Sequence, residues 1–315
     1  MRKIFALLAI LLFGTQISYA DDGKIHIVTS IKPLHSIVAN IVGDKADLTL
    51  LVGKRMSPHG FILKPSHVRA LKKADHVFYI HSLLEEFLRK LEMNNGKGDK
   101  FQPLLNIPGI KFHKVRRGIV WEDDDDHIIP DANNRDKRIS LDDYSKDLHI
   151  WLDVGNAVTL ADYVASFLSE RHPQYARFFQ ENAEKLSAKI AALDTSLRDI
   201  LQGKADIPFI VFHDAYQYFE KNYNLNAAGS IKYDPNENSS IKRLKAIRQR
   251  LHADNIRCVF SEPQFPLKNV EKVIEGTEAR IFEIDPHGSR LSPGKDHYFE
   301  MMNLLGKNFK ACLSQ

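Results

Sequence analysis

Short apolar runs alternate with amphipathic segments along most of this chain. Runs such as IHIVTS at 25–30 and DLTLLV at 47–52 are rich in β-branched residues and predict buried strands. Segments with helical spacing follow them at 34–43 and 65–74. Strands that alternate with helices are typical of a mostly parallel sheet covered by helices, which places the chain in the α/β class.

The longest helical pattern covers 173–203. It starts with Pro173 and ends at Gly203, as expected for the two ends of a helix. Its apolar positions recur at steps of three and four: Leu186, Ile190, Leu193, Leu197 and Ile200. At 1.5 Å per residue such a helix is about 45 Å long, which exceeds the width of one small lobe. We therefore expect it to connect two lobes.

Strand and helix alternate again after residue 203, through ARIFEI at 279–284. A single core rarely serves more than about 250–300 residues, so a chain of 315 residues predicts two α/β lobes. We expect an N-terminal lobe at 21–172, the linking helix, and a C-terminal lobe at 204–315. The stretch 121–147 is acidic and polar without an apolar period, and it predicts a loop.

The first 20 residues have the pattern of a secretory signal. A basic start is followed by IFALLAILLFG, which is too short to span a bilayer, and by the small residues Ser18 and Ala20 around a cleavage point. No cysteine lies near that point, which disfavours a lipid anchor. We expect cleavage after Ala20 and a periplasmic protein that is not embedded in the membrane.

Charge and cysteines add two constraints. The net charge of +4 includes Arg2 and Lys3 of the signal, so the mature chain is nearly neutral and does not favour a nucleic-acid partner. The chain has an even number of cysteines, Cys258 and Cys312, and an exported protein enters an oxidising compartment. A disulfide between them is favoured over two buried thiols.

Ligand-binding residues are expected where predicted strands end, because parallel sheets bind ligands beyond their carboxyl ends. His59, His149, His213 and Asp285 lie at such places. Three imidazoles and one carboxylate suit a four-coordinate Zn²⁺ ion. The spacing alone is a weak indication, since the four residues are far apart and no HExxH motif occurs.

Several motifs then resemble one family, the ZnuA-like zinc-specific substrate-binding proteins of bacterial ABC importers, in metal-binding cluster A-I. The matching stretches include LVGKRMSPHGFILKPS, DLHIWLDVGNA, VFHDAYQYF, CVFSEPQF and EIDPHGSRLSPG, in order over nearly the whole mature chain. The resemblance implies two lobes joined by a long backbone helix, with one metal in the cleft between them. It implies that His59, His149 and His213 are metal ligands and that Asp285 occupies the position of a fourth. The cysteine pair also matches a disulfide of some members.

The chain departs from that family at several places. Many members carry a histidine-rich loop where this chain has Asp123, Asp124, Asp125, Asp126 and His127. These five residues are either a solvated segment or a weak accessory cation site. His81 stands where relatives often have glycine and is either a neighbour of the metal or a helix-start residue. His35 is a candidate to support a ligand, and Glu262 is an oxygen that can substitute for Asp285.

We expect the remaining histidines to be structural or solvated: His26, His67, His76, His113, His172, His252, His287 and His297. We expect a monomeric zinc carrier that delivers its ion to an inner-membrane ABC permease and has no catalytic role. The alternatives are a manganese carrier of the same family, an exported zinc metallohydrolase and an adhesin-type surface protein. Three histidines favour zinc over manganese, and no glutamate accompanies a histidine pair as a protease would require.

Overall fold

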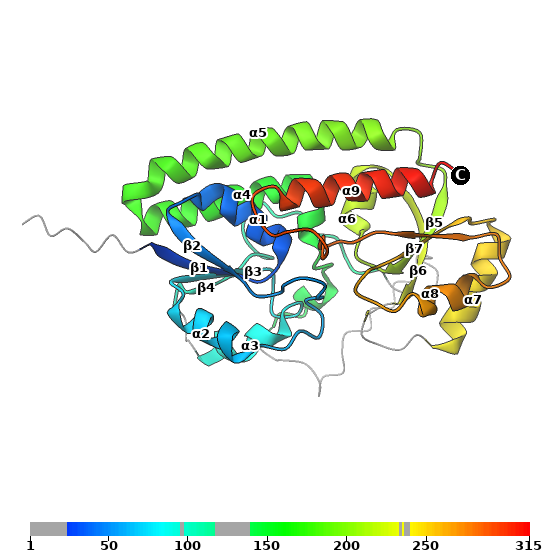
Figure 1. Ribbon diagram of the computed structural model, residues 1–315, viewed down its shortest axis with the longest axis horizontal. Helices are drawn as coiled ribbons and strands as arrows, with labels where there is room; N and C mark the ends of the chain where they lie inside the picture. The colour runs from blue at the N-terminus through cyan, green and yellow to red at the C-terminus, as the bar shows by residue number, and fades with distance from the viewer. Residues whose placement is uncertain (1–23, 95–97, 117–138, 233–234, 236–239) are drawn as a thin grey trace, which may run out of the picture.

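The computed structural model describes residues 24–94, 98–116, 139–232, 235 and 240–315. They form two lobes, each built on a four-stranded parallel sheet (Figure 1). The first sheet has the order β2-β1-β3-β4 and consists of β1 (Ile25–Thr29), β2 (Ala46–Leu50), β3 (His76–Tyr79) and β4 (Phe101–Pro103). The second has the order β6-β5-β7-β8 and consists of β5 (Pro208–His213), β6 (Asn226–Lys232), β7 (Cys258–Ser261) and β8 (Arg280–Glu283).

Helices cover both sheets, which confirms the predicted α/β class with two lobes. They are α1 (Lys32–Val42), α2 (Pro65–Lys73), α3 (Glu86–Asn94), α4 (Val154–Arg171), α5 (Ala176–Leu201), α6 (Gln217–Asn222), α7 (Ile241–Ala253), α8 (Lys268–Ile274) and α9 (His297–Cys312). Short 3-10 turns lie at Asp143–Ser145, Ile150–Leu152 and Pro173–Tyr175. Within the described ranges, no helix is both long and apolar enough to cross a membrane.

The two sheets share a topology that matters for ligand binding. In each lobe the first strand lies beside the third, and the strand order changes direction between them. Parallel sheets open a crevice beyond their carboxyl ends at such a point. In the second sheet this point lies between β5 and β7, where His213 and Glu262 are found.

Helix α5 is the predicted long connection. It runs along one side of both lobes, with α9 beside it (Figure 1). Leu186, Ile190, Leu193 and Leu197 are buried as the apolar spacing predicts, while Ile200 is half-buried. Their cluster of apolar side chains continues from the first sheet through α5 and α9 to the second. One continuous core therefore holds both lobes.

Polar contacts also join the lobes, between α1 and the segment that leads into α9. The buried Lys32 ammonium donates to the carbonyl oxygens of Ser289 at 2.7 Å and Leu291 at 2.8 Å. The Ser36 hydroxyl donates to the Lys295 carbonyl at 2.8 Å and accepts the Tyr298 amide at 3.1 Å. These bonds fix the start of α9 against the first lobe.

The predicted disulfide is present between Cys258 on β7 and Cys312 at the end of α9. It ties the chain end to the second sheet across a sequence separation of 54 residues. A loop of this length corresponds to about 4 kcal/mol in the chain-entropy account.

Some elements differ from the sequence prediction. Strands β4 and β6 were not predicted, because FQP is very short and NAAGSIK is rich in small residues. Helix α3 begins at Glu86, whereas Ser82 and Glu85 have the spacing of a capping box. Glu85 instead turns inward, where its carboxylate accepts the Ser30 hydroxyl at 2.6 Å and two backbone amides. Burial raises the pKa of Glu85 to about 7 despite these bonds.

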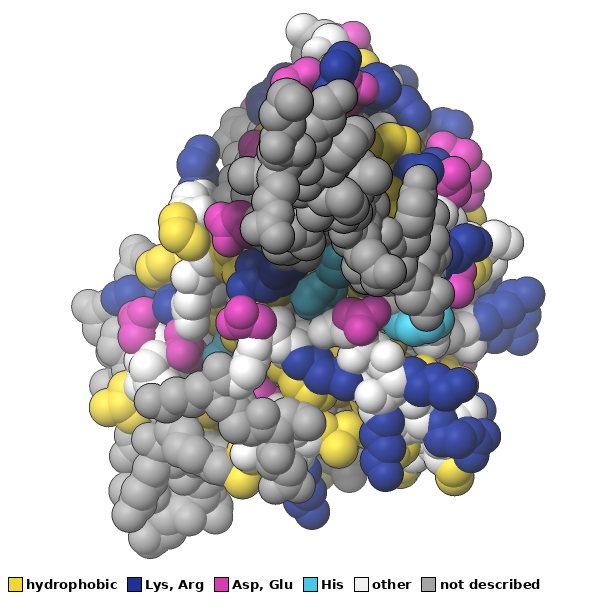
Figure 2. All heavy atoms as spheres, turned by 90° about the vertical axis from the view of Figure 1, so that its left-hand side faces the viewer, with side chains coloured by type: hydrophobic (Ala, Val, Ile, Leu, Met, Phe, Trp, Pro, Cys, Tyr) yellow, Lys and Arg dark blue, Asp and Glu magenta, His cyan; other side chains and the backbone are white. Residues whose placement is uncertain are grey.

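Charges of both signs share the surface at the first-lobe end of the molecule. Asp and Glu side chains lie across the middle of that face, and Lys and Arg gather toward one side (Figure 2). This mixture agrees with the small net charge of +4.

The contact between α5 and α9 provides a test of the shared core. Leu197 is fully buried and lies so close to Gly306 that a Cβ added there would be 2.5 Å from Leu197 Cδ2. We expect Leu197→Ala to lower the free energy of unfolding by about 2–5 kcal/mol, because a buried leucine leaves a cavity. Urea denaturation followed by circular dichroism measures this. Leu304→Ala on α9, where the side chain is 42% exposed, is the control and should cost far less.

Candidate metal centre

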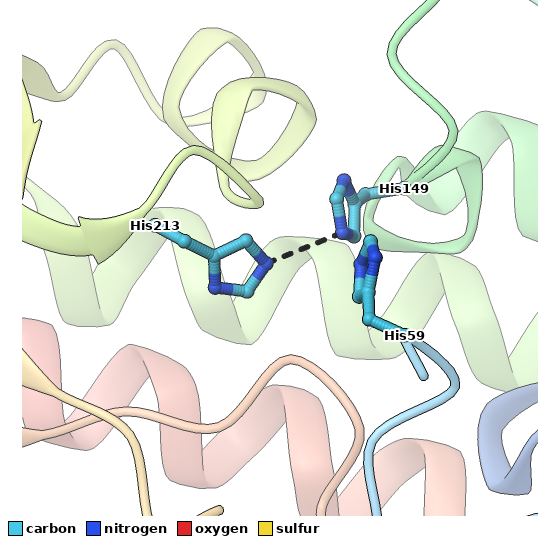
Figure 3. A group of neighbouring side chains, drawn as sticks. All are labelled: His59, His149 and His213. Carbon is cyan, nitrogen blue, oxygen red and sulfur yellow. Dashed lines mark hydrogen bonds between the residues drawn. The ribbon is translucent and has the colours of Figure 1, made fainter. Parts of the chain in front are cut away.

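A cavity of about 280 Å³ lies between the lobes. His59, His149 and His213 all line it, together with acidic and basic side chains of both lobes. His59 comes from the loop between β2 and α2, His149 directly precedes the 3-10 turn Ile150–Leu152, and His213 is the last residue of β5. Figure 3 shows the three rings pointing toward one another from these separate segments.

The three imidazoles are close enough to share one ion. One nitrogen of each lies within 4.8 Å of the others. The ring centroids are 5.8 Å apart for His59 and His149, 5.7 Å for His59 and His213, and 5.3 Å for His149 and His213. Among the described residues no other group of three or more His, Cys, Asp or Glu side chains converges in this way.

Two of the rings are held from behind by buried carboxylates. His149 Nδ1 is 2.8 Å from Asp147 Oδ1, and His213 Nδ1 is 2.6 Å from Glu262 Oε1. A carboxylate accepts hydrogen bonds, so in each pair Nδ1 carries the hydrogen. Neutral imidazole then has a lone pair on Nε2, and such carboxylate support orients histidine ligands in metal sites.

The two Nε2 atoms face each other across the lobes at 3.4 Å (Figure 3). Two nitrogens bound to Zn²⁺ at about 2.0–2.1 Å in a tetrahedron are about 3.3–3.4 Å apart. The observed separation therefore already matches one edge of a zinc tetrahedron. Two facing lone pairs repel each other unless a proton or a metal cation lies between them.

The three rings differ in how readily they lose a proton. Burial lowers the pKa of His59 well below its usual range, and the neighbouring His213 and His149 lower it further. His59 Nε2 is buried with no hydrogen-bond partner among the described residues. Burial acts in the same direction on His213, but the Glu262 carboxylate outweighs it and raises the pKa of His213.

His149 is positioned by a short antiparallel stem. Val115 donates its amide to the Ser145 carbonyl at 2.8 Å, and Asp147 donates its amide to the His113 carbonyl at 2.8 Å. This pairing joins the two chain segments that flank residues 117–138. It places Asp147 and His149 at the cavity wall.

The stem is also fastened to the second lobe. Arg116 Nε donates to both carboxylate oxygens of Asp214, at 3.1 and 3.0 Å, and the same guanidinium pairs with Glu220. Gln217 Nε2 donates to the Lys114 carbonyl at 2.9 Å. Since Asp214 directly follows His213, one ion-pair cluster links the segment before His149 to the residue after His213.

Comparison with known proteins identifies the family. The sequence profile described as ZnuA, zinc-uptake complex component A, periplasmic, matches residues 27–312. The chain belongs to this family. It is 35% identical over 308 residues to the high-affinity zinc uptake system protein ZnuA of Brucella suis biovar 1 (strain 1330), covering 92% of each chain. The resemblance drawn from the motifs is thus confirmed.

Solved structures share the fold at lower identity. The Pseudomonas aeruginosa protein FpvC in complex with Mn²⁺ has a TM-score of 0.76 and 19% identity, with 93% of this chain and 99% of that chain covered. The periplasmic zinc-binding protein TroA from Treponema pallidum has a TM-score of 0.74 and 20% identity, with 93% and 100% covered. Proteins of this fold are thus described with different metals, so the donor set of each chain must be considered by itself.

Asp285 of this ZnuA-family chain does not lie among the converging donors. Its carboxylate accepts the Gln264 side-chain amide at 2.7 Å and the backbone amides of His287 at 3.0 Å and Ser289 at 2.5 Å. Both oxygens are therefore used to shape the turn after β8. That Asp285 is a fourth ligand stays a prediction. Glu262 Oε1 is 2.6 Å from His213 Nδ1, and that Glu262 can substitute for Asp285 at the ion also stays a prediction.

His35 and His81 lie outside the group of three. His35 on α1 is largely buried, and burial together with His297 lowers its pKa to about 4. His81 Nε2 is 3.7 Å from Asp143 Oδ2, and Asp143 lines the cavity. The five residues of the acidic stretch, Asp123, Asp124, Asp125, Asp126 and His127, lie outside the described residues.

Sequence reasoning missed one residue near the site. Asp147 was included in the acidic loop, and its position two residues before His149 was the available indication of a supporting carboxylate. His287, expected to be structural or solvated, is buried with its ring 4.9 Å from that of Trp151.

The Glu262–His213 pair can be tested directly. We expect Glu262→Gln to weaken zinc binding by about 10–100-fold, because a neutral amide supports the ligand imidazole less well than a carboxylate. Competition with a chelator of known affinity measures this. Glu283→Gln, whose carboxylate is ion-paired with Arg290 at the surface, is the matched control. Equal effects of both substitutions would contradict the assignment.

The opposite pKa shifts of His59 and His213 predict how metal affinity depends on pH. A metal ion binds the lone pair of a neutral imidazole, so each ligand histidine must lose its extra proton. His59 is already neutral near pH 7. His213 retains its proton to a higher pH than usual. We expect binding to release about one proton, so affinity should rise by about tenfold per pH unit up to the raised pKa of His213 and then level off. Calorimetry in buffers of different ionisation enthalpy counts the protons. A flat profile across that range would refute the expectation.

Proposed function

We propose that this protein captures Zn²⁺ in the periplasm and delivers it to an ABC-type permease in the inner membrane. The observation that carries the proposal is the convergence of three imidazole nitrogens within 4.8 Å. The buried carboxylates of Asp147 and Glu262 behind two of the rings keep the ligand nitrogens oriented. Family membership and the name of the Brucella relative support the same cargo and pathway.

The donor set favours zinc over manganese. Imidazole nitrogens suit zinc, whereas manganese prefers carboxylate, carbonyl and water oxygens. The carboxylates nearest the rings, Asp147 and Glu262, have an oxygen committed to a histidine Nδ1 and act as supports. In this proposal His59, His149 and His213 bind the ion directly, and the protein has no catalytic role.

Delivery depends on where these donors are attached. His59 and His149 belong to the first lobe and His213 to the second. A relative movement of the lobes by about 1 Å would spoil the nitrogen geometry, which needs metal–nitrogen distances within about 0.2 Å of ideal values. We therefore infer that the permease releases the ion by displacing one lobe or the loop of His59.

The remaining assignments complete the proposal. The signal 1–20 directs export and is cleaved after Ala20, although these residues lie outside the described part of the chain. The lobes are 21–172 and 204–315, with 173–203 as the link, and the mature protein acts as a monomer.

The ligand assignment predicts a graded mutation series. We expect His59→Ala, His149→Ala and His213→Ala each to weaken zinc binding by more than the roughly 10–100-fold typical of losing a supporting contact. His81→Ala, which removes a histidine beside the cavity-lining Asp143 but outside the group, should have a much smaller effect. Chelator competition and elemental analysis of the purified mature protein measure affinity and stoichiometry. Four similar losses, or a wild-type protein that binds no zinc, would overturn the proposal.

A further inference from the structure

The two most exposed large apolar side chains of the described residues hold equivalent places in the two lobes. Ile62 is 82% exposed and lies three residues before α2, and Ile241 is 86% exposed and begins α7. In each lobe this helix connects the second strand of the sheet to the third. A single exposed isoleucine is ordinary, but one at the same place in each lobe indicates a shared use.

Basic side chains follow Ile62 on α2. The stretch 48–74 contains six Lys and Arg residues and no Asp or Glu. Arg69, Lys72 and Lys73 are exposed at helical spacing, so they share the solvent-facing side of α2. None of the three makes an ion pair with a described residue. Their positive charge is therefore available to a partner.

Helix α7 repeats this pattern in the second lobe. Its sequence, IKRLKAIRQRLHA, contains five Lys and Arg residues and no Asp or Glu. Lys242 and Lys245 are exposed near Ile241 and make no ion pair with a described residue. Two arginines nearer the carboxyl end of the helix are ion-paired instead. The available charge of α7 thus lies at the end that carries the isoleucine.

Both helices lie on the side of the molecule away from α5 and α9 (Figure 1). The helices packed next to them do not cancel their charge, since α3 has two Glu against one Arg and one Lys, and α8 has one Glu against two Lys. Because the whole chain has a net charge of only +4, this side concentrates positive charge. We call the following residues the basic face: Ile62, Arg69, Lys72, Lys73, Ile241, Lys242 and Lys245.

The composition of the basic face fits a lipid surface better than a protein surface. Protein interfaces have a packed apolar centre, and they are enriched in Arg and depleted of Lys. Here four of the five basic residues are Lys, and the two isoleucines stand singly in different lobes. At an anionic bilayer, Lys and Arg attract the headgroups while apolar side chains enter the boundary between headgroups and acyl chains.

We propose that the basic face binds the surface of a bilayer that contains anionic lipids, with Ile62 and Ile241 entering the headgroup layer. The inference goes beyond the proposed function, and the binding involves neither the metal nor its ligands. Only its setting, the outer surface of the inner membrane, rests on the proposed function. There the contact keeps the carrier at the membrane that contains the permease.

Co-sedimentation of the mature protein with vesicles tests the charged part of the basic face. We expect binding to phosphatidylglycerol mixed with phosphatidylcholine but not to phosphatidylcholine alone, and this binding should fall steeply as salt is added. Each basic residue near an anionic surface strengthens binding by about fivefold, so combining Arg69→Gln, Lys72→Gln and Lys73→Gln should weaken it by about 100-fold.

A second triple variant is the matched control for net charge. It combines Lys185→Gln, Lys189→Gln and Lys307→Gln, which remove the same charge from exposed positions on α5 and α9. This variant should keep nearly the wild-type affinity for the vesicles, because those helices lie on the opposite side of the molecule (Figure 1).

The apolar part of the basic face is tested separately. Combining Ile62→Ser with Ile241→Ser should weaken vesicle binding by about tenfold or more, because less apolar surface leaves water. The salt dependence should remain. Leu304→Ser, which changes an apolar side chain that is 42% exposed on α9, is the control and should bind as the wild-type protein does.

The outcomes distinguish this inference from the proposed function. Absence of binding to anionic vesicles, or equal losses in the two triple variants, would overturn the inference. Binding only when purified permease is present in the bilayer would also overturn it and assign the face to the permease. Binding that appears only after the aspartates at 123–126 are changed to Asn would assign the face to the chain's own acidic stretch. Zinc affinity, measured by chelator competition on the same variants, should stay unchanged, and a protein that binds vesicles but no zinc would contradict the proposed function alone.

Discussion

The central constraint of this structure is the close approach of two imidazoles from different lobes. His149 Nε2 and His213 Nε2 are 3.4 Å apart, and each ring has its opposite nitrogen fixed on a buried carboxylate. The pKa of His213 is raised, so its imidazole holds a proton to a higher pH than a free histidine, and on Nε2 that proton lies between the two rings. A zinc ion bound there would replace the proton, so the approach of the two rings presents both nitrogens to one ion.

The rest of the fold maintains the close approach of these two rings. A shared apolar core along α5 and α9, the bonds of Lys32 and Ser36, and the pairing of Arg116 with Asp214 all hold the lobes together. Holding the nitrogens in place before the metal arrives reduces the ordering cost of binding. The contacts that hold the two lobes together therefore contribute to metal affinity, although most of the residues that make them lie outside the cavity.

The sequence predicted the parts of this arrangement that follow from local patterns. Periodicity identified most strands and the long helix. The meeting of His149 and His213 was implied by the family resemblance and not by strand order, since the two residues belong to different lobes and His149 precedes a 3-10 turn instead of meeting a strand. Periodicity could not predict the roles of the carboxylates Glu262, Asp285 and Asp147. These roles depend on the direction in which each side chain points, and that direction decides which hydrogen-bond donor it meets. Glu85 shows the same limit: a helix-capping spacing gave way to a bond with Ser30, which is distant in sequence.

The same limit bears on the choice of metal. FpvC with Mn²⁺ and the zinc-binding TroA share this fold, so the arrangement of lobes does not choose the metal. Selectivity must come from the few side chains that line the cavity. In this chain the carboxylate oxygens of Asp285 accept backbone amides of the turn after β8. The donors that converge among the described residues are the imidazoles of His59, His149 and His213, and imidazole nitrogen suits zinc better than manganese.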